Sequence, residues 1–379
     1  MPRPATPSDQ RLVTQQDVAD TCGVTRVTVS LVLSGHPRIS PATREKVLIA
    51  AQRLGYDPVA HESARRMGYR RLGRTQVNHV IGLLLPQGQL GVPYFLRMVD
   101  GIARVAEKID YCLMIAQIPM PYHQAVQNAL RPMIRGDVDG VITVGSPLTV
   151  EAVRELQRRL GFSGRPIVSM IRPSPGTAFV GTDDAPGVSQ AIDALVGRGH
   201  REFLVLWTGA SDTPFPPTAE YSARRIALAE SIRHHGLSEA RCLRFHKVPS
   251  HWMAPNLSRA RLETPHGDVG DAEVIRLLRQ HQGMTALLCD NDAVAINAMI
   301  ALQRAGLKVP EQYAVVGFDD TDPFPGADGR NILSSIAVPL EEVGRVAGEL
   351  LLERISDPTL NKGPVLLPTT FRARRSIGG

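Results

Sequence analysis

The chain has 379 residues, more than one ordinary domain, so two or three packed units are expected. Hydrophobic residues make up 43% of it and charged residues 21%, which excludes disordered and collagen-like proteins. No apolar run reaches the roughly 18 residues of a membrane span, and the first residues lack the apolar core of a signal peptide. The four cysteines have no paired spacing, which excludes a disulfide scaffold and favours a reducing cytoplasm.

The excess positive charge lies in the first fifth of the chain. Residues 1–76 hold 12 Lys and Arg against 6 Asp and Glu, whereas the other 303 residues hold 31 of each sign. A small basic module joined to a neutral body is typical of proteins that bind a polyanion. A solvated basic tail would have the same charge, so charge alone leaves both interpretations open.

Residues 12–55 contain the signals of three short helices. The first begins with Thr14 as its N-cap and Asp17 three residues later, the spacing of a capping box, and Gly23 ends it. Ser40, which is followed by proline, begins the third helix. Two helices joined by a tight turn that contains glycine form a helix-turn-helix unit, whose second helix can enter the major groove of DNA.

The second helix has one apolar stripe, formed by Val29, Val32 and Leu33. The other side chains therefore face away from the core. Arg26 at the leading end suits the two acceptors of guanine, and Val27 suits a thymine methyl group. The residues predicted to contact DNA in this head are Thr14, Thr25, Arg26, Val27, Thr28, Ser30, Leu31 and Ser34. An ordinary three-helix cap with a solvated Arg26 is the alternative.

Residues 13–58 resemble the DNA-binding head of the LacI/GalR repressors. The matching stretches are DVA, GVT followed by TVS, VLSG, S-x-x-TREKV and LGY-x-P. The resemblance implies that Arg26, Val27 and Leu31 occupy the base-contacting positions. Family members usually have arginine where this chain has Leu31, so we expect weaker guanine recognition at one operator position.

Residues 59–77 are the expected linker. The family has a short hinge helix here, which becomes ordered on DNA and wedges an apolar side chain into the minor groove. In this chain the segment is polar and basic, and Val59 stands in place of the usual asparagine. We place the wedge at Met67 and expect Arg65 and Arg66 to lie near phosphates. A flexible basic linker is the alternative.

From Val80 onward, short apolar runs alternate with amphipathic stretches of helix length. The runs are VIGLLLP (80–86), CLMIAQI (112–118), GVITVG (140–145), PIVSMI (166–171), FLVLW (203–207), TALLC (285–289) and AVVGF (314–318). Continuous apolar strands that alternate with helices predict doubly wound parallel sheets, which are buried on both faces. About 300 residues of this pattern are enough for two such lobes.

Polar side chains follow several of these strands. Asp183 and Asp184 precede one helix, Asp292 precedes another, and the aromatic pair Tyr94 and Phe95 follows the first strand. Ligands of open α/β sheets bind beyond the carboxyl ends of the strands. Carboxylates opposite a stacking face suit a polyol or a nucleobase. A helix N-cap is the alternative for Asp184 and Asp292.

Residues 79–379 resemble the two-lobed, periplasmic-binding-protein-like core of the same family, most clearly in VGTDDAPG, NDAVAINAM and GLKVPEQYAVVGFDD. The resemblance implies an effector pocket formed by Tyr94, Phe95, Arg172, Asp183, Arg224 and Asp292. Ile171 stands where many relatives have a carboxylate, which makes a sugar effector less certain. Residues 244–268 form a longer irregular segment than the family usually has. Trp252 in that segment either stacks on the ligand or anchors the loop.

Signals of other chemistry are missing from the sequence. It has no phosphate-binding loop and no nucleophile elbow. Its histidines and cysteines lack metal-site spacing, and the aspartates near Asp320 lack the glycine and closing glutamate of a calcium loop. We therefore expect no enzymatic activity, no metal and no cofactor beyond a small-molecule effector.

Three regions are predicted: an all-α helix-turn-helix domain at 1–58, a linker at 59–77, and an α/β core of two doubly wound parallel sheets at 78–379. We expect lobe 1 to consist of about 78–182 and 319–355. Lobe 2 would then consist of about 183–318 and 356–379.

These regions predict a ligand-responsive transcription regulator, most simply a repressor. It would act as a homodimer on a pseudo-palindromic, double-stranded DNA operator, in a bacterial cytoplasm and associated with the nucleoid, without a membrane partner. Its effector would be a sugar-like or related metabolite. The alternatives are a solute-binding receptor with a non-specific basic tail and an enzyme on the same α/β architecture.

Overall fold

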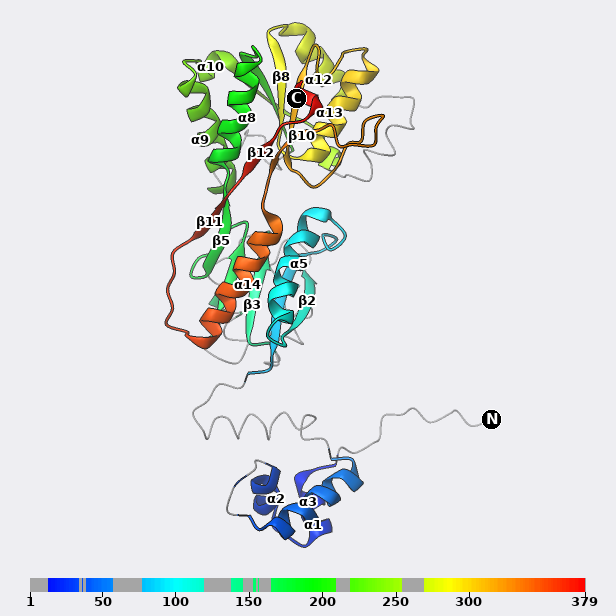
Figure 1. Cartoon of the computed structure of the whole chain (residues 1–379), viewed down its shortest axis with the longest axis vertical. Coiled ribbons are helices and arrows are strands. Elements are labelled where there is room, and N and C mark those ends of the chain that lie inside the picture. Colours follow the sequence, from blue (N-terminus) through cyan, green and yellow to red (C-terminus); the bar gives the residue numbers. More distant parts are fainter. Residues whose placement is uncertain are drawn as a thin grey trace, which may run out of the picture. The chain divides into compact units, whose positions relative to one another are not determined.

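The computed structural model describes residues 13–33, 36, 39–56, 77–118, 138–145, 153, 154, 156, 165–208, 219–253 and 269–378. The chain divides into two compact units, Met1–Val77 and Asn78–Gly379, which are called the head and the body below (Figure 1). Within the described ranges, every helix is too short or too polar to span a membrane.

The head contains three helices, α1 (Gln15–Cys22), α2 (Arg26–Leu33) and α3 (Pro41–Leu54). At the start of α1, the Thr14 hydroxyl accepts from the Asp17 N–H at 3.3 Å, and the Asp17 carboxylate accepts from the Thr14 N–H at 2.7 Å. The Ser40 hydroxyl accepts from the Thr43 N–H at 3.2 Å and caps α3. Gly23 ends α1 with a φ of 62°, a conformation that other residues adopt only with strain. The predicted helices and caps are confirmed.

The three helices of the head enclose a small apolar core. Val29 and Val32 of α2 are buried in it, and Leu33 packs against it half-buried. Val18 of α1 and Val47 of α3 complete its centre. Because the stripe on α2 faces this core, the remaining faces of α2 are left to solvent.

The body contains two six-stranded sheets. The first has the order β11-β5-β4-β3-β1-β2 and consists of β1 (Val80–Pro86), β2 (Cys112–Ile118), β3 (Gly140–Val144), β4 (Ile167–Met170), β5 (Ala178–Asp183) and β11 (Val365–Pro368). The second has the order β12-β10-β9-β8-β6-β7 and consists of β6 (Glu202–Trp207), β7 (Leu243–Lys247), β8 (Met284–Cys289), β9 (Ala314–Asp319), β10 (Ser334–Ala337) and β12 (Thr370–Arg372). All pairs are parallel except β10 with β12. The predicted parallel sheets are confirmed.

Helices cover the apolar faces of the two sheets. On the first sheet, α5 (Pro93–Glu107) packs against α14 (Leu340–Ser356) (Figure 1). A Cβ atom on Gly101 would lie 2.0 Å from the Glu341 carbonyl oxygen, and one on Gly344 would lie 2.1 Å from that of Met98. These two glycines therefore allow the backbones of α5 and α14 to touch, which holds the start of α5 in place.

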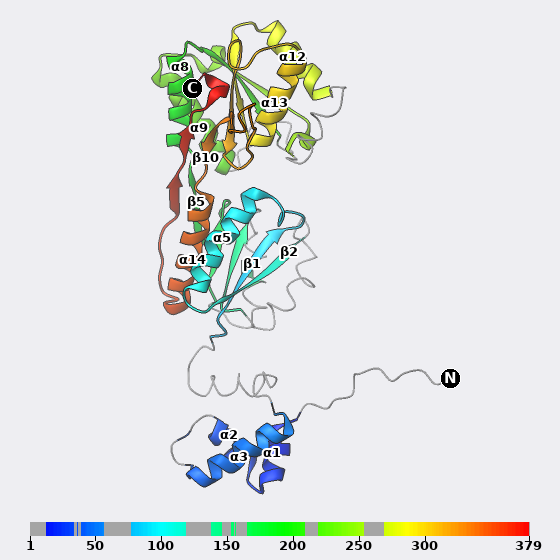
Figure 2. The same cartoon turned by 45° about the vertical axis from the view of Figure 1, so that its right-hand side comes forward.

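The second sheet is covered on both faces. The helices α8 (Ala185–Gly197) and α9 (Ala219–His234) lie on one side of it, and α12 (Val269–Gln280) and α13 (Asp292–Arg304) lie on the other (Figure 2). Alternate residues of β6 enter the two cores: Phe203 and Val205 face α8 and α9, and Leu204 packs with the α12 and α13 side. The short elements α10 (Glu239–Cys242), η2 (Ser250–Met253) and η3 (Arg375–Ile377) complete this lobe.

The chain crosses between the lobes three times, from β5 to α8, from β10 to α14 and from β11 to β12. The expected crossings near residues 319 and 356 are wrong. After β9 the chain returns to the same sheet as β10, which pairs with β9, and it crosses only after Ala337. After α14 it first adds β11 beside β5 and crosses at Thr369. Both missed strands have only four residues, and their pairing is set by the neighbouring strand rather than by a local apolar run.

The crossings decide which edges of the sheets meet. Each crossing leaves its sheet at the carboxyl end of a strand, so the carboxyl ends of both sheets face the other lobe. Thr369 joins two crossings, because its N–H and its hydroxyl both donate to the Asp183 carbonyl, at 3.0 and 3.1 Å. Polar side chains at the strand ends of both lobes are thereby directed to the region between them.

Candidate functional site

The helix α2 presents the predicted DNA-binding face to solvent. Val27 is 67% exposed, Arg26 and Ser30 are exposed, and Thr28 and Leu31 are half-buried. A valine in this position on a short helix leaves apolar surface in water unless another molecule covers it. The arrangement is that of a helix which can dock in a groove.

Two of the threonines predicted to contact DNA act as helix caps. Thr14 forms the capping box of α1, and the Thr25 hydroxyl accepts from the Thr28 N–H at 3.1 Å. Their contact with DNA stays a prediction. The DNA contacts predicted for Ser34, Arg65, Arg66 and Met67 lie outside the described residues.

Arg44 is a functional candidate that the sequence did not reveal. Its guanidinium, which comes from α3, donates to the carbonyl of Val32 at 3.3 Å and to that of His36 at 2.7 Å. These carbonyls belong to the last turn of α2 and to the segment after it. Arg44 therefore joins α2 to α3. Its place in the TREKV stretch carried the family resemblance but did not show which carbonyls it binds.

Four predicted pocket residues lie at the carboxyl edge of the first sheet. Tyr94 and Phe95 begin α5 and are half-buried, with ring centroids 5.3 Å apart and planes at 75°. Arg172 follows β4 and is half-buried. Asp183 is the last residue of β5, not the first of lobe 2. It is exposed, and one of its carboxylate oxygens accepts from the Ala185 N–H at 3.0 Å.

Arg224 of α9 is held at the edge of the second sheet. Its Nε lies 3.1 Å from Asp184 Oδ2, and its Nη1 donates to the Asp290 carbonyl at 3.0 Å. Its Cζ lies 3.4 Å from the ring centroid of Phe318, a cation–π contact. Arg224 therefore connects α9 with the start of α8 and with the ends of β8 and β9.

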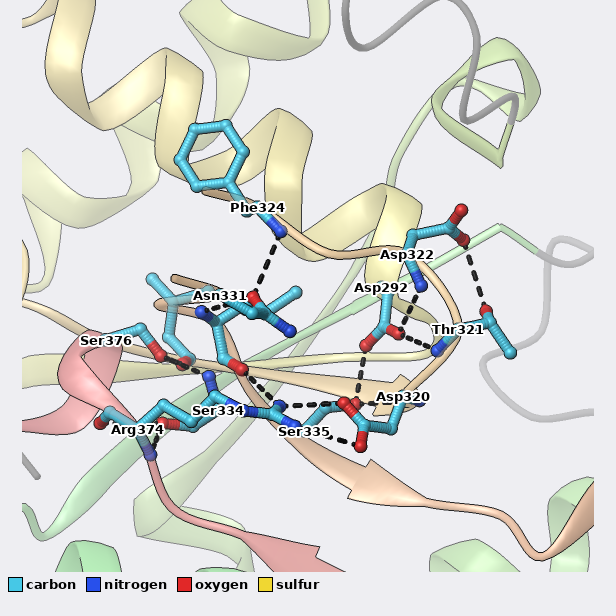
Figure 3. Close-up of polar contacts among 12 residues, drawn as sticks. Asp292, Asp320, Thr321, Asp322, Phe324, Asn331, Ser334, Ser335, Arg374 and Ser376 are labelled. Carbon is cyan, nitrogen blue, oxygen red and sulfur yellow. Dashed lines mark hydrogen bonds and ion pairs between the residues drawn. The ribbon is translucent and has the colours of Figure 1, made fainter. Parts of the chain in front are cut away.

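Asp292 is buried at the first turn of α13 (Figure 3). Its Oδ2 accepts from the N–H groups of Thr321 and Asp322, at 2.7 and 3.2 Å, and its Oδ1 accepts from the Ser335 hydroxyl at 2.5 Å. The helix N-cap is Asn291, whose side chain accepts from the Val294 N–H, so capping is not the role of Asp292. Asp292 instead connects the turn that follows β9 with strand β10.

Burial raises the pKa of Asp292 to about 7. The three hydrogen-bond donors lower this pKa, and the negative charge of Asp320 raises it. Desolvation is the larger effect because the carboxylate loses its contact with water. Asp292 therefore titrates near neutral pH while it holds this turn.

The same turn is attached to the C-terminal segment (Figure 3). Arg374 binds the Asp320 carboxylate through two nitrogens, at 2.7 and 3.0 Å. The Ser334 N–H donates to the Ser376 hydroxyl at 2.8 Å, and that hydroxyl donates to the Val315 carbonyl. Residues around β10, which leads into a crossing, are thus fixed by groups from three separate parts of the chain.

Trp252 is not available to a ligand. Its side chain is 0% exposed within the apolar core on the α12 and α13 side, and its carbonyl accepts from Asn297 Nδ2 at 3.0 Å. A Cβ atom on Gly270 would lie 2.9 Å from its ring. The predicted stacking on a ligand is therefore wrong, and the alternative role as a loop anchor describes this residue. Residues 254–268 lie outside the described ranges.

The head and the body, each by itself, define a class of protein: a helix-turn-helix joined in one chain to a two-lobed body with polar side chains at the strand ends. Residues 14–59 match the family described as bacterial regulatory proteins, lacI family, and residues 192–377 match the periplasmic binding protein-like domain. The chain belongs to the LacI family of transcriptional regulators. It is accordingly a ligand-responsive DNA-binding regulator and not an enzyme, which sets the two alternatives aside.

Relatives match over nearly the whole chain. Catabolite control protein A of Priestia megaterium is 26% identical over 96% of this chain and 99% of its own length. The ribose operon repressor of Haemophilus influenzae is 27% identical over 97% and 99%. The repressor CytR of Escherichia coli K12 is 27% identical over 96% of both chains.

Solved structures share the fold. The Lac repressor dimer bound to operator and the anti-inducer ONPF has a TM-score of 0.62 at 21% identity, over 97% of this chain and 99% of that one. The transcriptional regulator CelR in complex with cellobiose has a TM-score of 0.59 at 23% identity, over 96% and 99%. These likenesses support the head-and-two-lobe architecture.

Proposed function

We propose that this chain is a repressor that acts as a homodimer in the bacterial cytoplasm, on the DNA of the nucleoid. Its two heads bind the half-sites of a pseudo-palindromic operator, and a small polyhydroxylated molecule between the lobes changes that binding. The observation that supports it best is the presence of polar and aromatic side chains at the carboxyl edges of both sheets, which face the other lobe. The ribose operon repressor and the CelR–cellobiose complex agree with a sugar-like ligand.

The ligand contacts are proposed on both lobes. Tyr94 and Phe95 supply a stacking face, and Arg172 and Asp183 supply polar groups from the first lobe. Arg224 and Asp292 are proposed for the second lobe. Both are already bound to neighbouring residues, so a ligand either uses their remaining donor and acceptor positions or replaces existing hydrogen bonds.

A buried ion pair holds the first residues of the body to lobe 1, at the amino ends of the parallel strands. The Asp139 carboxylate accepts from the Asn78 N–H at 2.8 and 2.9 Å and from the Val80 N–H at 3.3 Å. Arg165 lies 3.6 Å from Asp139, and both side chains are buried. The first residues after the linker are therefore held to the interior of lobe 1, so a rotation of that lobe moves the point where the linker ends.

Coupling of the two sites requires that the ligand bind one lobe arrangement more tightly than the other. A coupling free energy of about 1–3 kcal/mol changes operator occupancy about 5–150-fold. The hinge in this proposal is formed by Thr369 and its partners at the crossings, because the chain passes between the lobes only three times.

Selection of bound duplexes from a random library, followed by mobility shift with genomic fragments, tests the proposed function. We expect a two-fold symmetric consensus and its release by one class of polyhydroxylated compound. Binding with no sequence preference at moderate salt would contradict the proposal, because charge alone produces such binding.

A further inference from the structure

Asp290 lies at the carboxyl end of β8, and only one of its two carboxylate oxygens accepts hydrogen bonds from the residues that the structure describes. The residue is 9% exposed. Its Oδ2 accepts from the N–H and from the hydroxyl of Thr208, both at 2.8 Å. Its Oδ1 is buried and has no hydrogen-bond partner among the residues that the structure describes. A buried acceptor without a donor costs free energy, so a native structure retains one for a reason.

Few positive charges act on the Asp290 carboxyl. Arg224 donates to Asp184 and to the backbone carbonyl of Asp290, and neither of these two hydrogen bonds reaches the Asp290 carboxylate. Burial raises the pKa of Asp290, and burial together with the negative charges of Asp292, Asp290 and Asp184 raises that of Asp319, while Arg224 lowers both. Burial therefore disfavours the charged forms, and a positive charge placed beside Asp290 would stabilise its ionised carboxylate.

A small cavity adjoins these groups. It has a volume of about 40 Å³ and is lined by Asp290, Arg224, Arg225, Phe318 and mostly apolar residues of α8, α9, β6, β8, β9 and β10. Such a space accommodates one small polar group, whereas a whole ligand needs about 300 Å³ or more. The cavity therefore has room for one end of a ligand only.

We propose that Asp290 selects a ligand that carries a primary amine, by accepting a hydrogen bond from its ammonium group at Oδ1. The chemical class is a hydroxylated ring with an amino substituent, such as an amino sugar. An ammonium group brings donors and a positive charge that favours the ionised carboxylate, a hydroxyl brings a donor without charge, and an anion is repelled by that carboxylate. This inference rests on the proposed function, because it takes the site between the lobes as given.

The first experiment needs no ligand. Asp290→Asn keeps the shape of the side chain, leaves an oxygen for Thr208 and removes the ionisable carboxyl. Thermal unfolding of the full chain should show an unchanged or higher midpoint for this variant. Thr208→Val is the control, which should lower the midpoint because Oδ2 loses a donor. A fall of several degrees for Asp290→Asn would overturn the proposal, since it would show that Oδ1 already has a partner.

The second experiment uses calorimetry with glucosamine, galactosamine and mannosamine, each against its parent hexose, and with glucose 6-phosphate and glucuronate. At least one amino sugar should bind the wild type about tenfold more tightly than its parent hexose. Asp290→Asn should abolish most of that preference. Absence of binding by all three amines, equal binding of the parent hexoses, or tighter binding of either anion would each overturn the assignment.

The two proposals fail in different ways. Release of the operator by an uncharged sugar, with the same response in Asp290→Asn, would overturn the role of Asp290 and leave the repressor function intact. Loss of sequence preference in the duplex selection would overturn the repressor function, while the calorimetric preference for an amine would still be measured on the same chain.

Discussion

The exposed face of α2 and the carboxyl edge of the second sheet use polar side chains in opposite ways. On α2, Arg26, Val27 and Ser30 stand in solvent, and the helix is held by its caps and its buried stripe. At the sheet edge, Arg224 and Asp292 are bound to groups of their own chain. The head therefore offers a ready surface for docking, whereas a ligand in the body has to compete with existing bonds. This difference explains why the same chain can have a rigid reader and a responsive sensor.

The largest expected effect is the pH dependence of the sensor's stability. The pKa of Asp292 is about 7 in the folded chain and 3.8 when unperturbed, so the folded state holds an extra proton between these values. The free energy of unfolding should therefore fall as pH rises from about 4 to about 7, by a few kcal/mol for this group. Urea unfolding at several pH values measures it. The difference between wild type and Asp292→Asn isolates this residue, and parallel profiles would contradict the burial argument.

Removal of the Asp292 carboxylate should impair ligand binding by the body and spare DNA binding by the head. Asp292→Ala leaves two buried N–H groups and the Ser335 hydroxyl without their acceptor, which should destabilise the body by about 3 kcal/mol. We expect loss of the ligand response with operator affinity largely retained. Urea unfolding, calorimetry and mobility shift measure these effects. Asp328→Ala, at an exposed ion pair, is the control and should have little effect. Normal ligand binding by Asp292→Ala would mean that the pocket is elsewhere.

Arg26→Ala should weaken the reader without affecting the sensor. We expect a cost of about 1–3 kcal/mol in operator binding and a relaxed preference at one base position. Duplex selection with the variant measures the preference. An unchanged consensus would remove Arg26 from the readout.

Arg44 should affect operator affinity by holding α2 in its position in the head. Arg44→Met keeps the apolar stem and removes the donors to Val32 and His36, which should lower operator affinity about tenfold. The slope of affinity against salt should stay the same, because the loss of a phosphate contact would reduce it by about one. Arg53→Met, on the exposed side of the same helix, is the matched control. A reduced slope for Arg44→Met would indicate a phosphate contact instead.

The smallest expected effect concerns Leu31. Leu31→Arg restores the donor that family members usually have and should strengthen or shift guanine preference at one position, by about 1 kcal/mol. Binding selection compared with wild type measures it. No change in the selected sequence would mean that α2 docks differently from the helices of its relatives.

The sequence predicted what depends on near neighbours along the chain. The cap at Thr14, the turn at Gly23 and the stripe of Val29 and Val32 involve residues within one or two helical turns, so their spacing was enough. Seven of the strands were predicted for the same reason, because each is a continuous apolar run. Five others, among them β10 and β11, were missed because the pairing of such short strands depends on the neighbouring strand.

Only the tertiary structure decided how distant groups are paired. The partners of Asp292 are 29, 30 and 43 positions away in sequence. Arg374 binds Asp320 at 54 positions and Thr369 binds Asp183 at 186, and Trp252 was buried by residues from other elements. Composition and periodicity report burial and local geometry, but they carry no information on which buried donor meets which acceptor. That choice is made by the packing of the two sheets and by the three crossings between them. The same packing therefore decides which hydrogen bonds each carboxylate at the proposed ligand site makes.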